Sequence, residues 1–261
     1  MREFEILDTN LRATLRVFAQ AKDSGEARDM PGVLLISSGV GYSTFNAALL
    51  TEPVESAREL DRRVAIAAVY FRARALPWSF WLCEDWLSRR VRSEAGDVLW
   101  GHRCRCLSDL PGMVTERLLP PVRPLAELEY RRVEDEPTRF EFNHLMSVCF
   151  GIPFPISSEI YGSEQTWRSR FVGHLGYVDG NAVASAATLA AAGAVGVYSV
   201  ATLPDHRRKG YAEAITRRAL EEARQWSGIE RTVLQACPAA APLYERLGYR
   251  TVTRYTVFAS E

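Results

Sequence analysis

The chain has 261 residues, of which 47% are hydrophobic and 25% are charged, a composition typical of a folded protein with a buried core. Its 32 Lys and Arg residues balance its 32 Asp and Glu residues. The overall charge therefore attracts neither nucleic acid nor an anionic membrane, and we expect neither as a partner.

In the first half, apolar runs predict strands over residues 32–39, 45–50 and 76–82, and a helix begins near Asp85. Between the second and third of these strands, residues 54–74 carry an apolar stripe at helical spacing, which predicts a long helix. Aromatic residues crowd the region that follows. We expect them to form the core of the first half or, alternatively, to line a substrate pocket: Trp78, Phe80, Trp81 and Trp86.

Three prolines stand within five positions near the middle of the chain: Pro120, Pro121 and Pro124. Proline suppresses helix and favours an extended linker. We therefore expect two domains, residues 1–124 and residues 125–261.

In the second half, the patterns predict a strand over residues 128–135, a helix over 137–150, and another helix from Ser157 or Ser158 to Phe171. Three strands follow over 172–179, 181–190 and 194–203, and Asp179-Gly180 between the first two is a hairpin signal. The last predicted elements are a helix over 211–226 with an apolar stripe ending at Trp226, a strand over 231–236, a short helix over 241–248 and a strand over 251–258. The order strand, long helix, strand, short helix thus occurs in both halves and predicts a duplicated fold.

Residues 180–204 contain no charged side chain and are about as long as a membrane span. Most of them are Ala, Gly, Ser and Thr, so the transfer of this segment into lipid is only weakly favourable. The AAAG in its middle favours a turn between two buried strands.

The N-terminal stretch MREFEILDTN has no apolar segment of the signal-peptide type. None of the five cysteines has CxxC spacing, and no second pair completes a metal site with Cys104 and Cys106. We therefore expect no metal and free thiols in a reducing cytoplasm, with Cys237 as a small buried residue.

The stretch YSVATLPDHRRKGYAEA, residues 198–214, places a basic cluster between a buried strand and a helix. A helix N-terminus presents unpaired N–H groups and a partial positive charge. Gly210 lets the backbone approach a ligand closely, and small Ala212 keeps the first turn clear. This combination predicts an anion site, with phosphate as its ligand.

Neither GxxxxGK[ST] nor GxGxxG is present. Instead, Arg207-Arg208-Lys209-Gly210-Tyr211-Ala212 resembles the acetyl-CoA signature [Q/R]-x-x-G-x-[G/A] of the GCN5-related N-acetyltransferase (GNAT) superfamily. The preceding strand and proline and the following helix, strand and APLYERLGYR are also similar to that family. The resemblance covers roughly residues 128–258.

The resemblance implies an α/β (α+β) GNAT fold, a mixed and mostly antiparallel sheet with splayed central parallel strands flanked by helices, as a tandem of two GNAT-like lobes. It implies acetyl-CoA as cofactor and direct acetyl transfer to a primary amine of a small molecule, amino acid or peptide. The backbone of Val200, Ala201 and Thr202 would hold the pantetheine arm. The pyrophosphate would be held by backbone N–H groups of the next segment, supported by its basic side chains: Arg207, Arg208, Lys209, Gly210, Tyr211, Ala212 and Glu213. Tyr244 would be the general acid that protonates the CoA thiolate.

The general base is left open, because the strand GVYSVAT has no carboxylate. A water relay through Ser199 or main-chain carbonyls is one alternative, and solvent is another. Glu159, Glu164 and His144 stand in segments expected to approach the acceptor.

The first half departs from the family pattern, because the turn before its long helix has no glycine and carries Glu52, Glu55 and Glu59, which would repel phosphate. We expect this half to be a degenerate lobe that shapes the acceptor pocket, with Phe150, Ile152, Phe154 and Ile156 as further apolar wall. Two alternatives to catalysis stay open: a non-catalytic acyl-CoA-binding sensor or regulatory module, and a structural partner in an oligomer. A homodimer is compatible with the sequence.

Overall fold

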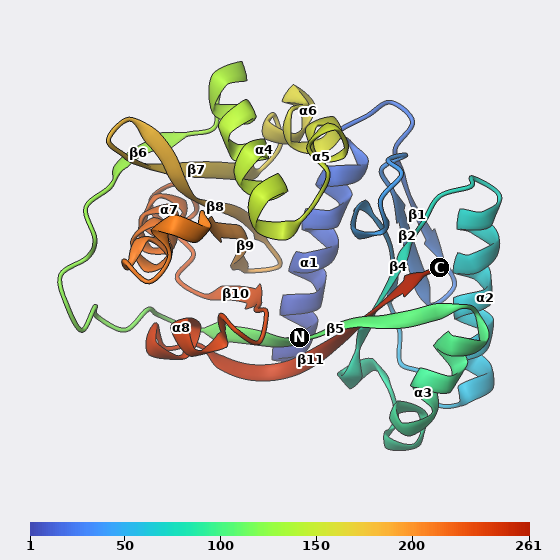
Figure 1. Cartoon of the computed structure of the whole chain (residues 1–261). Coiled ribbons are helices and arrows are strands. Elements are labelled where there is room, and N and C mark those ends of the chain that lie inside the picture. Colours follow the sequence, from blue (N-terminus) through green and yellow to red (C-terminus); the bar gives the residue numbers. More distant parts are fainter.

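One sheet of 11 strands runs through the whole molecule in the computed structural model, which describes residues 1–261, and helices cover both of its faces (Figure 1). The strands are β1 (Glu26–Met30), β2 (Val33–Ser37), β3 (Asn46–Leu50), β4 (Ser79–Cys83), β5 (Cys104–Thr115), β6 (Glu129–Arg132), β7 (Phe171–Val178), β8 (Asn181–Ala191), β9 (Ala194–Thr202), β10 (Thr232–Gln235) and β11 (Arg250–Ser260). The helices are α1 (Glu3–Ala19), α2 (Ala57–Arg72), α3 (Arg89–Gly101), α4 (Glu136–Phe150), α5 (Phe154–Tyr161), α6 (Glu164–Trp167), α7 (Tyr211–Ser227) and α8 (Ala241–Arg246).

The strand order β1-β2-β3-β4-β11-β5-β10-β9-β8-β7-β6 joins two lobes. We call β1 to β4 with α2 and α3 the N-lobe, and β6 to β10 with α4 to α8 the C-lobe. The strands β5 and β11 form a long antiparallel pair between them, and each is connected in the chain to one lobe but pairs with the other: β11 with β4, and β5 with β10. Figure 1 shows this pair crossing the base of the molecule.

Two neighbouring strand pairs are parallel, β3 with β4 and β9 with β10, and all other neighbours are antiparallel. In the chain, a helix lies between the two strands of each parallel pair: α2 connects β3 to β4, and α7 connects β9 to β10. The lobes therefore contain the same strand–helix–strand unit. The predicted mixed sheet with central parallel strands and flanking helices is confirmed.

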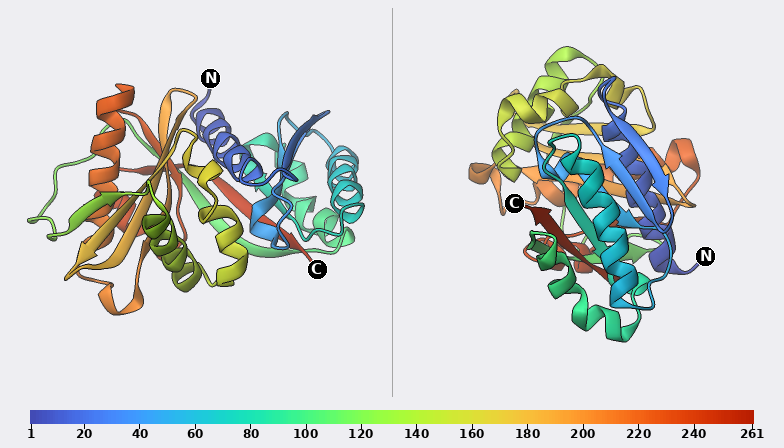
Figure 2. Two further views of the ribbon diagram at one scale, coloured as in Figure 1. Left: turned by 90° about the horizontal axis from the view of Figure 1, so that it is seen from above. Right: turned by 90° about the vertical axis from the view of Figure 1, so that its right-hand side faces the viewer.

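Helix α1 stands between the lobes and contacts strands of both (Figures 1 and 2). On the side of the N-lobe, buried Asp8 accepts hydrogen bonds from Trp86 Nε1 (2.9 Å) and from the hydroxyl of Tyr255 (3.1 Å) on β11. On the side of the C-lobe, Asn10 Nδ2 donates to the carbonyls of Ala191 and Ala194 (both 3.0 Å). Asp8 and Asn10, which lie within one turn of α1, thus bind the helix to both lobes.

The close approach of α1 to the C-lobe requires a residue without a side chain on β9. A Cβ atom added to Gly196 would lie 2.0 Å from Asn10 Oδ1, which also accepts a hydrogen bond from the Tyr198 hydroxyl at 2.7 Å. Any larger residue at position 196 would push α1 away from the sheet.

The segments with clear periodicity form the expected elements, including the two strands and turn over residues 180–204. The helix predicted from Ser157 or Ser158 to Phe171 is wrong, because α5 begins at Phe154 with Pro155 in its first turn, where proline is well accommodated, and β7 already begins at Phe171. Trp226 is 46% exposed and so extends beyond the buried stripe of α7. None of the helices is both long enough and apolar enough to cross a lipid bilayer.

Candidate functional site

The strands β9 and β10 separate soon after they meet. Only Val195 and Gly196 of β9 pair with β10, so residues 197–202 have no partner strand on that side. A bulge at Ser199, whose φ is 52°, interrupts the pairing of β9 with β8 on the other side. The backbone of Val200, Ala201 and Thr202 therefore lies along an open slot between two parallel strands.

Helix α7 begins directly beyond this slot without a side-chain cap. Its first residue follows Gly210, which has φ 90°, and Arg208 also has a positive φ of 65°. The helices α2 and α4 differ, because Ser56 and Asp135 accept hydrogen bonds from their first-turn N–H groups. At α7 the backbone N–H groups of residues 208–213 donate to no protein atom. They form a concave set of donors of the kind that binds anions.

The basic side chains at this turn differ in their surroundings. Arg207 Nε donates to the carbonyl of Thr202 at 3.1 Å, so this guanidinium braces the turn. Lys209 borders a cavity of about 150 Å³ beside Gly210, together with Arg123 from the proline-rich linker. A Cβ atom on Gly210 would lie 3.5 Å from Ala126 and 3.7 Å from the Arg123 guanidinium. The linker therefore passes over the entry turn of α7 and adds a further cation to those of the turn itself.

A larger cavity of about 440 Å³, the interlobe cavity, lies where the slot meets α1. Its wall comes from α1, the turn before β3, β4, β5 and β11 on one side, and from β9, β10, α5, α8 and the end of α4 on the other. The predicted pocket residues Phe150 and Ile152 line it, whereas Phe154 and Ile156 do not. Of the four aromatic residues expected to be core or pocket wall, Trp81 lines the cavity, and Trp78, Phe80 and Trp86 are buried.

Tyr244 on α8 borders the interlobe cavity, and its side chain is 6% exposed. Burial raises the pKa of Tyr244 well above its usual range, so the phenol stays protonated at neutral and mildly alkaline pH. Its hydroxyl makes no hydrogen bond to protein, whereas the neighbouring Tyr249 hydroxyl accepts one from Thr232 at 2.6 Å. Of these two buried tyrosines, only Tyr244 lines the cavity, where its hydroxyl can donate to a ligand.

No carboxylate or imidazole lines the interlobe cavity. The three residues expected near the acceptor lie elsewhere: Glu159 forms an ion pair with Lys22, Glu164 with Arg168, and His144 is exposed on α4. Ser199 does line the cavity. Cys237 also lines it and is exposed, so the prediction of a small buried cysteine is wrong, because this residue follows the last residues of β10 at the cavity mouth.

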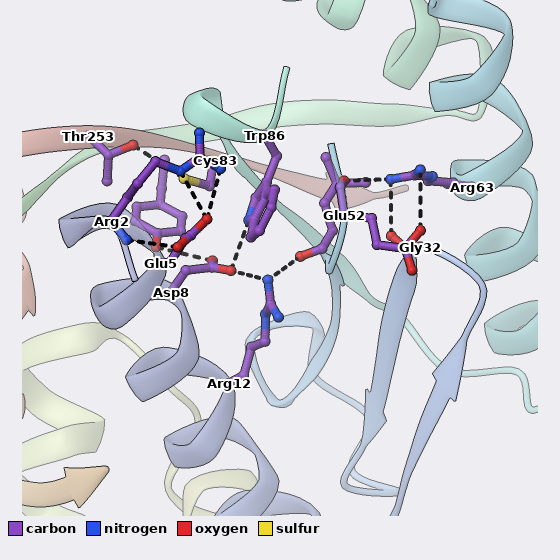
Figure 3. Close-up of polar contacts among 12 residues, drawn as sticks. Arg2, Glu5, Asp8, Arg12, Gly32, Glu52, Arg63, Cys83, Trp86 and Thr253 are labelled. Atoms are coloured by element: carbon purple, nitrogen blue, oxygen red, sulfur yellow. Dashed lines mark hydrogen bonds and ion pairs between the residues drawn. The ribbon is translucent and has the colours of Figure 1, made fainter. Parts of the chain in front are cut away.

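The corresponding turn of the N-lobe, between β3 and α2, is filled by its own side chains (Figure 3). Arg63 is buried and donates through Nη1 to the carbonyls of Gly32 (3.3 Å) and Glu52 (2.7 Å), and through Nη2 to that of Pro53 (3.0 Å). The turn thus directs carbonyl oxygens at an internal cation, the opposite polarity from the free N–H groups before α7.

The slot between β3 and β4 is closed as well. The Val54 N–H donates to the carbonyl of Trp86 at 2.7 Å, and the Ser88 N–H donates to that of Val54 at 3.1 Å, so the backbone continues to pair beyond the strands. Arg12, which is paired with Asp8, donates to the carbonyl of Leu50 at 2.6 Å. Groups of the protein therefore occupy the positions that remain open in the C-lobe.

The comparison with protein families agrees with this asymmetry. Residues 139–249 match the model of the acetyltransferase (GNAT) family, and this stretch contains the open slot, the α7 turn and Tyr244. Residues 139–249 are therefore a GNAT domain. No curated protein sequence matches the chain.

Solved structures extend the likeness in fold to the whole chain. A GCN5-related N-acetyltransferase from Kribbella flavida is 21% identical with a TM-score of 0.71, over 96% of this chain and 95% of that one. Another from Sphaerobacter thermophilus is 15% identical with a TM-score of 0.55, over 88% and 76%. A tandem GNAT protein from the clavulanic acid biosynthesis pathway is 11% identical with a TM-score of 0.54, over 97% and 95%.

Sequence reasoning did not find the contribution of α1 and of the linker to the surroundings of the GNAT domain. The residues Leu11, Leu15 and Phe18 line the interlobe cavity at helical spacing, a signal that was present in the sequence. Arg123 gave no such signal, because only the folded path of the linker brings it beside Gly210.

We predict that Arg63→Ala destabilises the protein by about 3 kcal/mol, because buried carbonyls then lack a donor. Urea unfolding measures the change. Arg62→Ala is the matched control, since Arg62 is exposed on the same helix, and its change should stay within about 0.5 kcal/mol. Equal unfolding midpoints for the two variants would contradict the assigned role of Arg63.

Proposed function

We propose that this chain is an acetyl-CoA-dependent N-acetyltransferase that acetylates a primary amine of a small molecule, amino acid or peptide. The observation that carries the proposal is the line of three features on the C-lobe: the free N–H groups of residues 208–213, the open slot along β9, and the interlobe cavity bordered by Tyr244. The three features follow the order of groups in a CoA thioester. The anion site matches the pyrophosphate, the slot matches the extended pantetheine arm, and the proton donor matches the sulfur.

The residues of this chain fit acetyl-CoA as follows. The N–H groups from Arg208 to Glu213 would bind the pyrophosphate, and Gly210 would allow its close approach. Arg208 and Lys209 would add charge, while Arg207 would hold the turn through Thr202. Backbone groups of Val200, Ala201 and Thr202 would hydrogen-bond the pantetheine arm.

Acetyl-CoA, a co-substrate, supplies the acetyl group and leaves as the thiol. As the amine nitrogen bonds to the acetyl carbon, the C–S bond breaks, the amine releases one proton and the sulfur gains one. Tyr244 would donate the proton to the sulfur, and burial suits this role because it keeps the phenol protonated at neutral pH. The released proton would reach solvent through water, with Ser199 as a candidate relay in the wall.

The division of the chain into residues 1–124 and residues 125–261, a degenerate lobe and a catalytic domain, is part of this proposal. The N-lobe would bind no cofactor, since Arg63 fills its turn, and would supply one wall of the acceptor site. The exchanged strands β5 and β11 make the two regions structurally interdependent.

A non-catalytic acyl-CoA sensor is the second candidate, favoured by the absence of any carboxylate or imidazole in the cavity wall. The release of CoA thiol from acetyl-CoA in the presence of a pooled amine library distinguishes the two functions. A sensor would bind the thioester without releasing thiol above the uncatalysed rate.

We predict that Gly210→Asp weakens acetyl-CoA binding at least about 100-fold, the effect of losing about two charge-assisted hydrogen bonds. The new carboxylate would stand among the anion-binding N–H groups. Calorimetry measures the affinity. Gly228→Asp is the matched control, because Gly228 has a similar positive φ of 69° at the other end of α7. Unchanged affinity in Gly210→Asp would refute the assignment of the anion site.

We predict that Tyr244→Phe lowers turnover by about 10²–10⁴ while leaving acetyl-CoA affinity nearly unchanged, since only the proton donor is lost. Tyr249→Phe, which removes a hydroxyl already bonded to Thr232, should keep turnover near the wild-type value. Steady-state thiol release measures both variants. If Tyr244→Phe turns over like the wild type between about pH 6 and about pH 9, Tyr244 has only a packing role.

A further inference from the structure

The wall of the interlobe cavity carries no ionised group. Of its 25 lining residues 19 are hydrophobic, and the other six are neutral: Thr14, Thr44, Ser79, Ser108, Ser199 and Gln235. Three of its phenols stay neutral too, since burial raises the pKa of Tyr161 to about 12 and raises the pKa values of Tyr198 and Tyr244 well above their usual range. A ligand in this cavity meets neither a counter-charge nor a side chain that can accept a proton at neutral pH.

The inner part of the cavity is aromatic. Phe18 of α1 meets Phe45 and Tyr161 edge to face, with ring centroids 5.9 and 5.7 Å apart, and Trp81 and Tyr42 add further aromatic surface. Such rigid rings form favourable contacts with another flat ring and lose little conformational freedom on binding.

The mouth of the cavity is apolar as well. Leu107 on β5 and Phe150 at the end of α4 both line the cavity and are 62% and 52% exposed. Large exposed apolar side chains at a cavity mouth mark an apolar ligand more readily than a charged one. Within the cavity wall, the amide nitrogen of Gln235 is buried without a hydrogen-bond partner and can donate to one polar atom of a ligand.

These features discriminate between two classes of amine. An alkylamine enters as an ammonium ion, which would lose its hydration without a counter-charge. It would also have to release an additional proton before it could attack, and no wall residue accepts one. An amine attached directly to an aromatic ring is neutral at physiological pH and keeps a free electron pair. Its single released proton balances the proton that the sulfur gains.

Building on the proposed function, we propose that the acceptor is a neutral, weakly basic amine on an aromatic or similarly apolar body, an arylamine by class. The ring lies in the aromatic inner part of the cavity, and the amine faces the slot between Ser199 and Tyr244. The acyl donor and the role of Tyr244 are unchanged by this choice of acceptor.

The isomers para-butylaniline and para-propylbenzylamine test the proposal, because they have the same formula and similar shape but only the second is cationic at neutral pH. Binding to the full chain without acetyl-CoA is measured through quenching of tryptophan fluorescence, and acetylation through thiol release. We expect the aniline to bind at least about 10-fold more tightly and to have a kcat/KM at least about 10-fold higher.

A charge at the cavity mouth should reduce this preference. In Leu107→Glu the ratio of aniline to benzylamine affinity should fall at least about 10-fold, because the carboxylate attracts the ammonium ion. Val69→Glu is the matched control, since Val69 on α2 is 64% exposed and lies outside the cavity wall, and the ratio should stay at the wild-type value. The exposure of Leu107 makes the variant compatible with folding, which its thermal midpoint checks.

The outcomes separate the two proposals. If acetyl-CoA binds and the benzylamine is bound and acetylated as well as the aniline, the arylamine assignment is overturned while the acetyltransferase function stands. The same holds if acetyl-CoA binds and neither isomer does. If calorimetry detects no acetyl-CoA binding, the proposed function fails and the acceptor assignment fails with it.

Discussion

The antiparallel pairing of β5 with β11 is the contact on which the rest of the molecule depends. Each of these strands follows one lobe in the chain and pairs with an edge strand of the other lobe. Without its partner, each lobe would therefore lack one strand of its sheet. The exchange creates the continuous 11-stranded sheet and leaves a junction that α1 covers, bonded to one side through Asp8 and to the other through Asn10. The interlobe cavity lies at this junction, so its shape depends on both lobes.

The two lobes use one architectural unit in opposite ways. In the C-lobe the parallel strands separate, and the following helix begins with free N–H groups at Gly210. In the N-lobe, the backbone of Val54 pairs with that of Trp86, and Arg63 donates hydrogen bonds to the carbonyls of the equivalent turn. The two turns differ in polarity as well as in accessibility. Backbone N–H donors face outward before α7, whereas carbonyl acceptors face the buried guanidinium of Arg63 before α2. One lobe is thereby suited to an anionic cofactor, and the other to supporting it.

The sequence predicted the C-lobe well from Tyr198 onward because its signals there are local. Strand, proline, glycine and amphipathic helix follow one another from Tyr198 onward, and the GNAT domain that they suggested is present. Strand β5 was missed because it contains Pro111 and Gly112, which argue against a central strand, although here a bulge accommodates the pairing with β11. The cavity wall could not be predicted, since it depends on contacts between residues as distant in the chain as Asn10 and Tyr198. The absence of a general base had been visible in GVYSVAT, and the structure extends that absence to the entire wall.

The central claim is that the chain has one acetyl-CoA site, which opens into a cavity shared by both lobes. A crystal structure of the full chain grown with CoA tests it most directly. The account predicts one CoA per chain, with its pyrophosphate on the N–H groups of residues 208–213, its arm along Val200 to Thr202 and its sulfur near Tyr244. CoA bound at the turn between β3 and α2, or a C-lobe slot that stays empty at saturating CoA, would contradict it.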